Sequence, residues 1–283
     1  MKTQSTRWQV IVSTVLALAV AFAGSLAGPA RATPQDPGSM AALGDSITTA
    51  FNTGSSFRDA PGNSWSTGSA LSTSLYRRFL ARPGSTINGQ NFNYAVTGAK
   101  MSNLLTQANR VGSIELVTVL MGANDVCTSS ESTMTSEAVF ETQFRAAMQV
   151  LAGPSAPANR VVYVLSIPRV KGLWEVLRFN GSARFAWWLF GICQSMLRNP
   201  LSTSSSDTQR RDRVDARNVA FNTILSTVCA EYGSRCRFDN NVVYNYAFTA
   251  SDISTRDYFH PSLTGQATLA REAWNEYRRQ VGP

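Results

Sequence analysis

One serine, one aspartate and the only histidine of the 283-residue chain could together form a nucleophilic site. Ser46 follows a short apolar run at residues 40–43, and Asp257 precedes His260 by three positions. A serine hydroxyl becomes a good nucleophile when a neighbouring base removes its proton, and histidine is the usual base. A carboxylate then fixes the imidazole tautomer and stabilises the imidazolium. The sequence therefore predicts Ser46 as nucleophile, His260 as base and Asp257 as the partner of His260.

The same chemistry needs hydrogen-bond donors for the oxyanion of a tetrahedral intermediate. The backbone N–H groups of Ser46 and Gly98 and the side-chain amide of Asn124 could supply them, since all three residues follow apolar runs. Each element also has a structural interpretation: Gly-Asp-Ser is usually a turn, an isolated histidine is usually structural, and Asn-Asp often caps a helix. The order and placement of all these groups together favour the functional interpretation.

Metal chemistry and nucleic-acid binding are disfavoured by the residue counts. One histidine cannot form a His-based metal cluster, and the four cysteines do not form paired CxxC knuckles. The net charge of +8 falls to +5 once the three basic residues of positions 1–32 are removed. The cluster Arg210, Arg211 and Arg213 alternates with acidic residues, which is typical of a solvated helix face. We therefore expect no metal, no cofactor and no nucleic-acid partner.

Residues 1–32 have the pattern of a secretory signal peptide. Lys2 and Arg7 precede an uncharged run at residues 8–30, and Ala30-Arg31-Ala32 has the A-x-A form of a cleavage site. An uncleaved membrane anchor is the alternative, because the uncharged run is long enough to span a bilayer. The glycines and proline that break its end favour cleavage. We therefore expect a secreted, extracellular protein consisting of residues 33–283.

An extracellular location implies that the four cysteines form disulfides. Three connectivities are possible. Cys229 and Cys236 are close enough in sequence to close a small loop, which leaves Cys127 to pair with Cys193. We favour this pairing as a hypothesis.

Short apolar runs alternate along the chain with segments of helical period. The runs lie at residues 40–43, 92–96, 116–121, 161–167 and, more weakly, 235–238, and helical spacing occurs near 71–79, 140–151, 214–232 and 269–277. This alternation predicts an α/β fold with a parallel sheet that helices cover on both faces. Binding sites of such sheets lie at the carboxyl ends of the strands. Ser46, Gly98 and Asn124 each follow one of the apolar runs and so meet this expectation.

Four stretches resemble the sequence blocks of the SGNH (GDSL) hydrolases: Gly44-Asp45-Ser46, Gly98, Gly122-x-Asn124-Asp125 and Asp257-x-x-His260. The resemblance extends over residues 40–281, and residues 63–68 and 121–127 are similar to secreted actinobacterial lipases and esterases and to phospholipase-B-like members. It implies a single domain at 33–283 with a three-layer α/β/α, flavodoxin-like fold of about five parallel strands. It also implies a Ser46–His260–Asp257 triad and an oxyanion hole of Ser46, Gly98 and Asn124.

A parallel-sheet unit does not require the segment at about residues 170–200, and we interpret it as an insertion. It contains six of the chain's aromatic residues, with basic residues interspersed. We expect Trp174, Trp187, Trp188 and Phe190 to bind substrate as an apolar wall or lid beside Ser46. A small satellite core, pinned by Cys193, is an equally good interpretation, and the two are compatible.

Together these features predict a secreted serine hydrolase, an esterase or lipase of the GDSL type, that cleaves lipid or phospholipid esters through an acyl-enzyme. A carbohydrate O-acetyl esterase is an alternative, because the SGNH family also removes acetyl groups from polysaccharides. A non-catalytic secreted lipid-binding protein is another, although the intact Ser46, Asp257 and His260 weigh against it. We expect a monomer with transient contact to a membrane or lipid interface.

Overall fold

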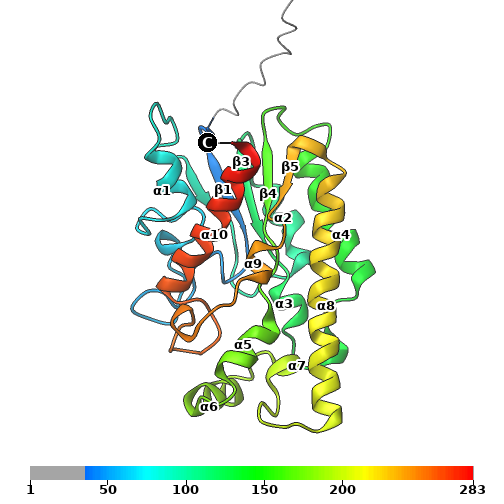
Figure 1. Cartoon of the computed structure of the whole chain (residues 1–283). Helices are drawn as coiled ribbons and strands as arrows, with labels where there is room; N and C mark the ends of the chain where they lie inside the picture. Colours follow the sequence, from blue (N-terminus) through cyan, green and yellow to red (C-terminus); the bar gives the residue numbers. More distant parts are fainter. Residues whose placement is uncertain (1–35, 283) are drawn as a thin grey trace, which may run out of the picture. The chain divides into compact units, whose positions relative to one another are not determined.

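A five-stranded sheet lies at the centre of the computed structural model, which describes residues 36–282. Every neighbouring pair of strands is parallel, in the order β2-β1-β3-β4-β5 (Figure 1). This order is that of flavodoxin-like sheets. The strands are β1 (Met40–Gly44), β2 (Asn91–Asn93), β3 (Leu116–Leu120), β4 (Val161–Val164) and β5 (Cys236–Phe238). The predicted signal peptide, residues 1–32, lies outside the described residues.

Helices occupy most of the segments between and after the strands. The α-helices are α1 (Leu75–Leu80), α2 (Leu104–Ala108), α3 (Ala123–Val126), α4 (Glu137–Ala152), α5 (Val170–Leu177), α6 (Gly181–Leu189), α7 (Gln194–Leu197), α8 (Ser205–Ala230), α9 (Val242–Asn245) and α10 (Leu263–Val281). Short 3-10 helices are η1 (Pro61–Asn63), η2 (Met101–Asn103), η3 (Glu131–Thr133), η4 (Gly233–Arg235) and η5 (Ala250–Asp252). Among the described helices, none has the length and hydrophobicity that a bilayer crossing requires.

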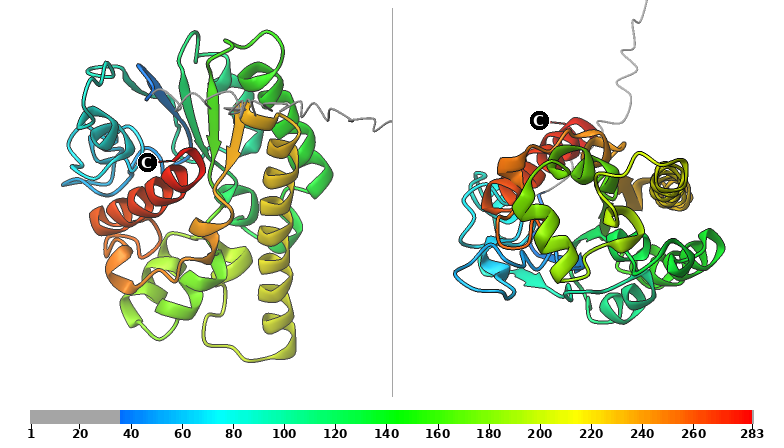
Figure 2. Two further views of the ribbon diagram at one scale, coloured as in Figure 1. Left: turned by 45° about the horizontal axis from the view of Figure 1, so that its top comes forward. Right: turned by 90° about the horizontal axis from the view of Figure 1, so that it is seen from below.

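The two faces of the sheet contribute to two separate hydrophobic cores. Successive side chains of a strand point to opposite faces, so β3 places Val117 and Val119 in one core and Leu116 and Leu120 in the other. Helices α2, α4 and α8 cover the first face, while α1 and α10 cover the second (Figures 1 and 2). The predicted three-layer α/β/α fold is therefore confirmed.

The second apolar run predicted a strand over residues 92–96, whereas β2 ends at Asn93. The side-chain oxygen of Asn93 accepts a hydrogen bond from the Ala95 N–H, 3.1 Å, and this turn ends the regular strand. The chain still follows β1, because the Val96 N–H donates to the Gly44 carbonyl at 3.1 Å. β2 is an edge strand, so apolar residues such as Phe92 remain partly exposed.

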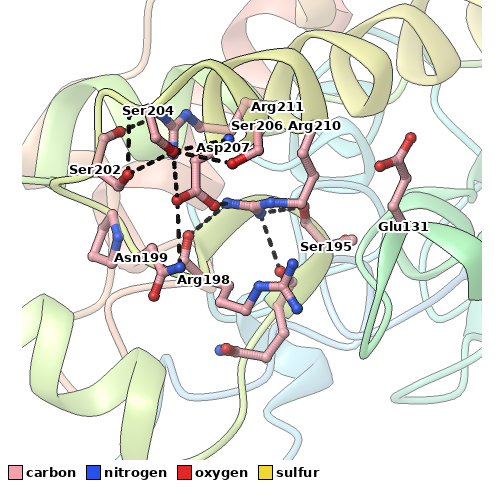
Figure 3. Close-up of polar contacts among 12 residues, drawn as sticks. Glu131, Ser195, Arg198, Asn199, Ser202, Ser204, Ser206, Asp207, Arg210 and Arg211 are labelled. Atoms are coloured by element: carbon pink, nitrogen blue, oxygen red, sulfur yellow. Dashed lines mark hydrogen bonds and ion pairs between the residues drawn. The ribbon is translucent and has the colours of Figure 1, made fainter.

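The predicted solvated face of Arg210 and Arg211 is wrong, because both side chains are buried. The Arg210 guanidinium donates to the Ser195 carbonyl at 2.6 Å, to the Arg198 carbonyl at 2.7 Å and to Asp207 at 2.8 Å (Figure 3). The chain that leaves α7 folds back over the start of α8, and its carbonyl groups need donors. The pattern of charges along α8 does not show that another segment of the chain buries this part of the helix.

The predicted insertion forms three short helices, α5, α6 and α7, between β4 and α8. Two disulfides are present, Cys127–Cys193 and Cys229–Cys236, which are the pairs favoured from the sequence. The first ties the loop after α3 to the start of α7, and the second ties the end of α8 to β5. The insertion is thus fixed at its far end by a disulfide and by the buried Arg210.

We expect Arg210→Met to lower the free energy of unfolding by about 3–5 kcal/mol, because it leaves the Ser195 and Arg198 carbonyl groups without this donor and the Asp207 carboxylate without its ion pair. Arg213→Met is the matched control: Arg213 lies on the same helix, but its side chain is 55% exposed. We expect the control to change stability by no more than about 0.5 kcal/mol. Urea denaturation followed by circular dichroism measures both, and equal effects would contradict the clamping role of Arg210.

Candidate active site

Ser46, His260 and Asp257 form a continuous hydrogen-bonded chain at the carboxyl ends of the strands. Nε2 of His260 lies 2.8 Å from Oγ of Ser46, and Nδ1 of His260 lies 2.6 Å from Oδ2 of Asp257. The His260 side chain is only 14% exposed and that of Asp257 only 7%. With its proton on Nδ1, a neutral imidazole donates to Asp257 and accepts the serine proton. These three residues can therefore generate a serine nucleophile.

A tight turn after β1 presents Ser46. Gly44 ends the strand where a Cβ atom would lie only 2.5 Å from the Leu120 carbonyl oxygen, so this close approach requires glycine. The backbone then turns at once, because the N–H groups of Thr48 and Thr49 both donate to the Asp45 carbonyl at 3.0 Å. The rigid end of a buried strand therefore fixes the position of the serine hydroxyl.

Asp257 organises the loop that carries His260. Its Oδ1 accepts hydrogen bonds from the N–H groups of Phe259, 3.0 Å, and His260, 3.1 Å. Burial by itself would raise the pKa of Asp257, but the hydrogen bonds from the His260 ring and from these two N–H groups outweigh it, and the pKa lies below its ordinary value. Asp257 is therefore held as a carboxylate that can stabilise an imidazolium.

Asn52 is a member of this network that the sequence did not reveal. Its side-chain amide donates to Oδ2 of Asp257, the oxygen that also faces His260. Asn52 is buried and has a left-handed backbone, with φ of 66°. The neighbouring Phe51 ring packs against the imidazole, with 5.0 Å between ring centroids. The only sequence signal is weak: asparagine tolerates the left-handed conformation that this loop needs.

Of the three candidate oxyanion donors, Ser46 and Asn124 line one cavity together with His260, whereas Gly98 lines a different one. Among the described residues, the backbone N–H groups of Ser46 and Gly98 have no hydrogen-bond acceptor. Gly98 has φ of 80°, and no atom lies within 4 Å of the position that its Cβ would occupy. The Asn124 amide donates to the Ala99 carbonyl at 3.0 Å, which holds the Gly98 loop against α3. The Ser46 N–H and the Asn124 amide thus lie at the cavity, and the Gly98 N–H lies on the loop that Asn124 anchors.

A cavity of about 440 Å³ opens beside Ser46, Asn124 and His260. One wall is the face of α5 that carries Val170, Leu173 and Val176, and another is the segment 244–248, which begins in the last turn of α9. Arg169 and Glu175 also line it, but they pair with each other at 3.0 Å, and Arg169 pairs with Asp215 as well. The cavity is therefore largely apolar, and its arginine is already neutralised.

The four aromatic residues expected to bind substrate do not line this cavity. Trp174 is buried, and the guanidinium groups of Arg178 and Arg211 lie 4.3 and 4.4 Å from its ring centroid. Trp187 is 1% exposed, and its indole N–H donates to the Tyr258 carbonyl at 2.9 Å. The amino-acid types alone do not distinguish these buried rings from Trp188 and Phe190, which are exposed on the surface.

Trp187 instead supports the His260 loop. Tyr258, two residues before the histidine, has a left-handed backbone with φ of 54°, which is costly for a tyrosine. The hydrogen bond from the Trp187 indole holds the carbonyl of this residue in place. Through Trp187 the insertion thus supports the backbone of the loop that carries His260.

A second carboxyl group, Asp45, is fully buried next to the nucleophile. Burial raises the pKa of Asp45 to about 7, although a hydrogen bond from the Ile47 N–H and the charge of His260 act in the opposite direction. Only one of its oxygens, Oδ1, accepts from a described residue, at 2.9 Å from Ile47 N, and Oδ2 has no such donor. Asp45 therefore lacks the donors that keep Asp257 charged.

A family model described as GDSL-like Lipase/Acylhydrolase matches residues 40–273, a range that contains all five strands and every candidate site residue. Among solved structures, LAE5, an alpha/beta hydrolase enzyme from the metagenome of Lake Arreo, Spain, is 15% identical with a TM-score of 0.50, over 86% of this chain and 94% of that chain. The extracellular lipase from Streptomyces rimosus is 20% identical with a TM-score of 0.47, over 84% and 98%. Phospholipase A1 from Streptomyces albidoflavus NA297 is 20% identical with a TM-score of 0.45, over 84% and 98%. No curated protein sequence matches the chain.

We expect Asn52→Gly to lower kcat by about 10- to 100-fold, because it removes a charge-assisted hydrogen bond to Asp257. Glycine keeps the left-handed backbone and so avoids strain. Without the amide, the carboxylate attracts the imidazolium proton more strongly, and the acidic limb of the pH–rate profile should move to higher pH.

Asn63→Gly is the matched control, because the Asn63 amide donates to Thr53 Oγ1 at 3.1 Å and not to the carboxylate. A purely structural effect of Asn52→Gly would lower activity without moving the pH profile. That result would contradict a role of the Asn52 amide in tuning the Asp257 carboxylate.

The raised pKa of Asp45 predicts a pH-dependent gain of stability in Asp45→Asn. Between the ordinary value of 3.8 and about 7, the folded chain binds a proton at Asp45 that the unfolded chain does not. The free energy of unfolding of the wild-type chain therefore falls, relative to that of the variant, as the pH rises through this window, by on the order of 1 kcal/mol per pH unit. Urea denaturation across the window measures the difference, and a difference that is constant with pH would contradict a neutral Asp45.

Proposed function

We propose that this chain, which belongs to the GDSL-like lipase/acylhydrolase family, is a secreted serine hydrolase that cleaves carboxylic acyl esters of lipid type. The observation that supports this most directly is the hydrogen-bonded chain from Ser46 through His260 to Asp257, at 2.8 and 2.6 Å, which opens on an apolar cavity. The geometry satisfies the requirement that nucleophile, base and orienting acid lie within hydrogen-bond reach.

In the proposed acylation step, Nε2 of His260 takes the proton of Ser46 Oγ while the oxygen attacks the ester carbonyl carbon. The N–H groups of Ser46 and Gly98 and the amide of Asn124 stabilise the resulting oxyanion. The imidazolium then gives its proton to the leaving alcohol oxygen as the carbon–oxygen bond breaks. Water reacts with the acyl-enzyme in the same way, giving its proton to His260, and releases the acid and free Ser46.

Asp257 stabilises the positive imidazolium in both half-reactions. Its depressed pKa keeps it ionised while His260 holds the serine proton. Two partners fix the carboxylate and the loop around it: Asn52 donates to Oδ2, and Trp187 donates to the neighbouring Tyr258 carbonyl.

The cavity supports an acyl group longer than acetyl. Its volume of about 440 Å³ greatly exceeds what an acetyl group fills, and apolar side chains of α5 form one wall. The pairing of Arg169 with Glu175 and Asp215 leaves no unpaired arginine in the wall for a phosphate. We therefore place an uncharged acyl chain in the cavity and the alcohol portion of the ester outside it.

Secretion is part of the proposal. Both disulfides require an oxidising compartment to form and persist. The predicted signal peptide at residues 1–32 would direct the chain to such a compartment.

A series of p-nitrophenyl esters from acetate to palmitate tests the substrate class. We expect kcat/KM to rise from acetate to a medium chain by about two- to fourfold per added CH₂, because each methylene is buried in the cavity. Leu173→Trp, which fills part of the cavity, should move the optimum to shorter chains. A collapse of activity beyond acetate would instead favour the O-acetyl esterase alternative.

The same assays test the mechanism. A fluorophosphonate should label the wild-type chain at Ser46, and Ser46→Ala should be neither labelled nor active. Asn124→Ala should lower kcat by about 10²–10³ if its amide is an oxyanion donor. An active, folded Ser46→Ala chain would overturn the mechanism, and an unlabelled, inactive wild type would favour the lipid-binding alternative.

A further inference from the structure

Helix α6 is apolar on two opposite sides. Ala183, Ala186 and Trp187 form its buried face, against the core. Phe185 and Trp188, on the other side, are 60% and 73% exposed. A helix on the surface of a soluble protein normally places polar residues on its outer face. The outer face of α6 therefore lacks the solvent-compatible side chains that its position would require.

The exposed apolar surface extends beyond α6. We call it the outer patch, and its members are Phe57, Phe179, Phe185, Trp188, Leu189 and Phe190, each more than half exposed. Phe57 comes from a different part of the chain, and its ring lies 6.3 Å from that of Phe190, centroid to centroid. Several large apolar side chains that gather on one surface indicate an interaction site, whereas singly exposed ones do not.

The outer patch and the candidate active site share two segments of the chain, the loop that contains residues 51–57 and the insertion. Phe57 belongs to the same loop as Asn52 and Phe51, which contact Asp257 and the His260 ring. Val176 of α5 lines the cavity and is itself 41% exposed. Figure 1 shows α6 at the lower end of the molecule, beyond α5, and in the view from below no other ribbon covers this segment (Figure 2).

The charges around the outer patch are mostly positive. Residues 170–200 contain four basic residues and one acid, Glu175, whose carboxylate pairs with Arg169. Among the described residues, neither Arg58, next to Phe57, nor Arg184, on α6, forms an ion pair with a carboxylate. The Arg178 guanidinium lies 4.8 Å from the centroid of the Phe179 ring. Aromatic rings flanked by free arginines suit the boundary of an anionic lipid layer.

We propose that the outer patch inserts into a lipid surface that carries anionic headgroups. The rings of Phe185 and Trp188 enter the boundary between headgroups and acyl chains, while Arg58 and Arg184 contact the phosphates. This orientation turns the entrance of the cavity toward the lipid. An acyl chain then passes from the lipid into the cavity without crossing water, and this last step alone rests on the proposed function.

The test is co-sedimentation with vesicles of phosphatidylcholine, with and without phosphatidylglycerol. The chain carries Ser46→Ala, so that no lipid is hydrolysed, and it is purified from the medium of a secreting host, with its N-terminus sequenced. We expect binding that is tighter on the anionic vesicles. The double variant Phe185→Ser/Trp188→Ser should bind at least about tenfold more weakly to both. Arg184→Gln should lose about fivefold on the anionic vesicles only.

Phe92→Ser is the matched control, because Phe92 is an exposed ring on the edge strand β2, outside the outer patch, and its loss should not change binding. Phe57→Ser, on a separate loop, repeats the test if the α6 variant fails to fold. The proposal is overturned by absence of vesicle binding, by equal binding of wild type and patch variants, or by a patch-dependent dimer that does not bind vesicles. If the wild-type chain, with Ser46 intact, were inactive on soluble esters but the chain still bound vesicles, the proposed function would be wrong and this inference would stand.

Discussion

The candidate site depends on one buried carboxylate, that of Asp257. Oδ1 accepts the N–H groups of Phe259 and His260, and Oδ2 faces the His260 ring and the Asn52 amide. A carboxylate can stay charged in a buried position only when such donors replace the water that it loses. Two of the four donors are N–H groups of the His260 loop, the third is the His260 ring and the fourth is the Asn52 amide. The same carboxylate therefore holds the fold of the His260 loop and orients the imidazole toward Ser46.

The insertion between β4 and α8 contributes to this site through several of its parts. Its buried face supplies Trp187, whose hydrogen bond fixes the backbone before His260, and α5 supplies the apolar wall of the cavity. Its outer face carries aromatic rings that are more than half exposed. The disulfide Cys127–Cys193 and the buried Arg210 hold the insertion against the sheet layers. One added segment thus supports the His260 loop, lines the cavity beside Ser46 and provides an exposed apolar surface.

The sheet and the meeting of Ser46 with His260 could be predicted because both follow from local patterns. Apolar runs mark parallel strands, and the carboxyl ends of such strands converge. Asn52 and Arg210 could not be found in this way, because their roles depend on how irregular loops fold over them. The same limit explains the tryptophans of the insertion: residue type indicates that a ring prefers burial, but only the packing shows that Trp187 is buried and Trp188 is not.

The two carboxyl groups near the nucleophile differ in state because they differ in donors. Asp257 is surrounded by N–H groups and has a lowered pKa, whereas Asp45 has one donor and a pKa raised to about 7 by burial. Environments that separate the pKa values of neighbouring acids assign them different roles. Below that pH, only Asp257 places a full negative charge beside His260. In the mechanism that we propose, a second charged carboxylate next to Ser46 would oppose the developing oxyanion, and a neutral Asp45 leaves the negative charge on Asp257, where it would stabilise the imidazolium.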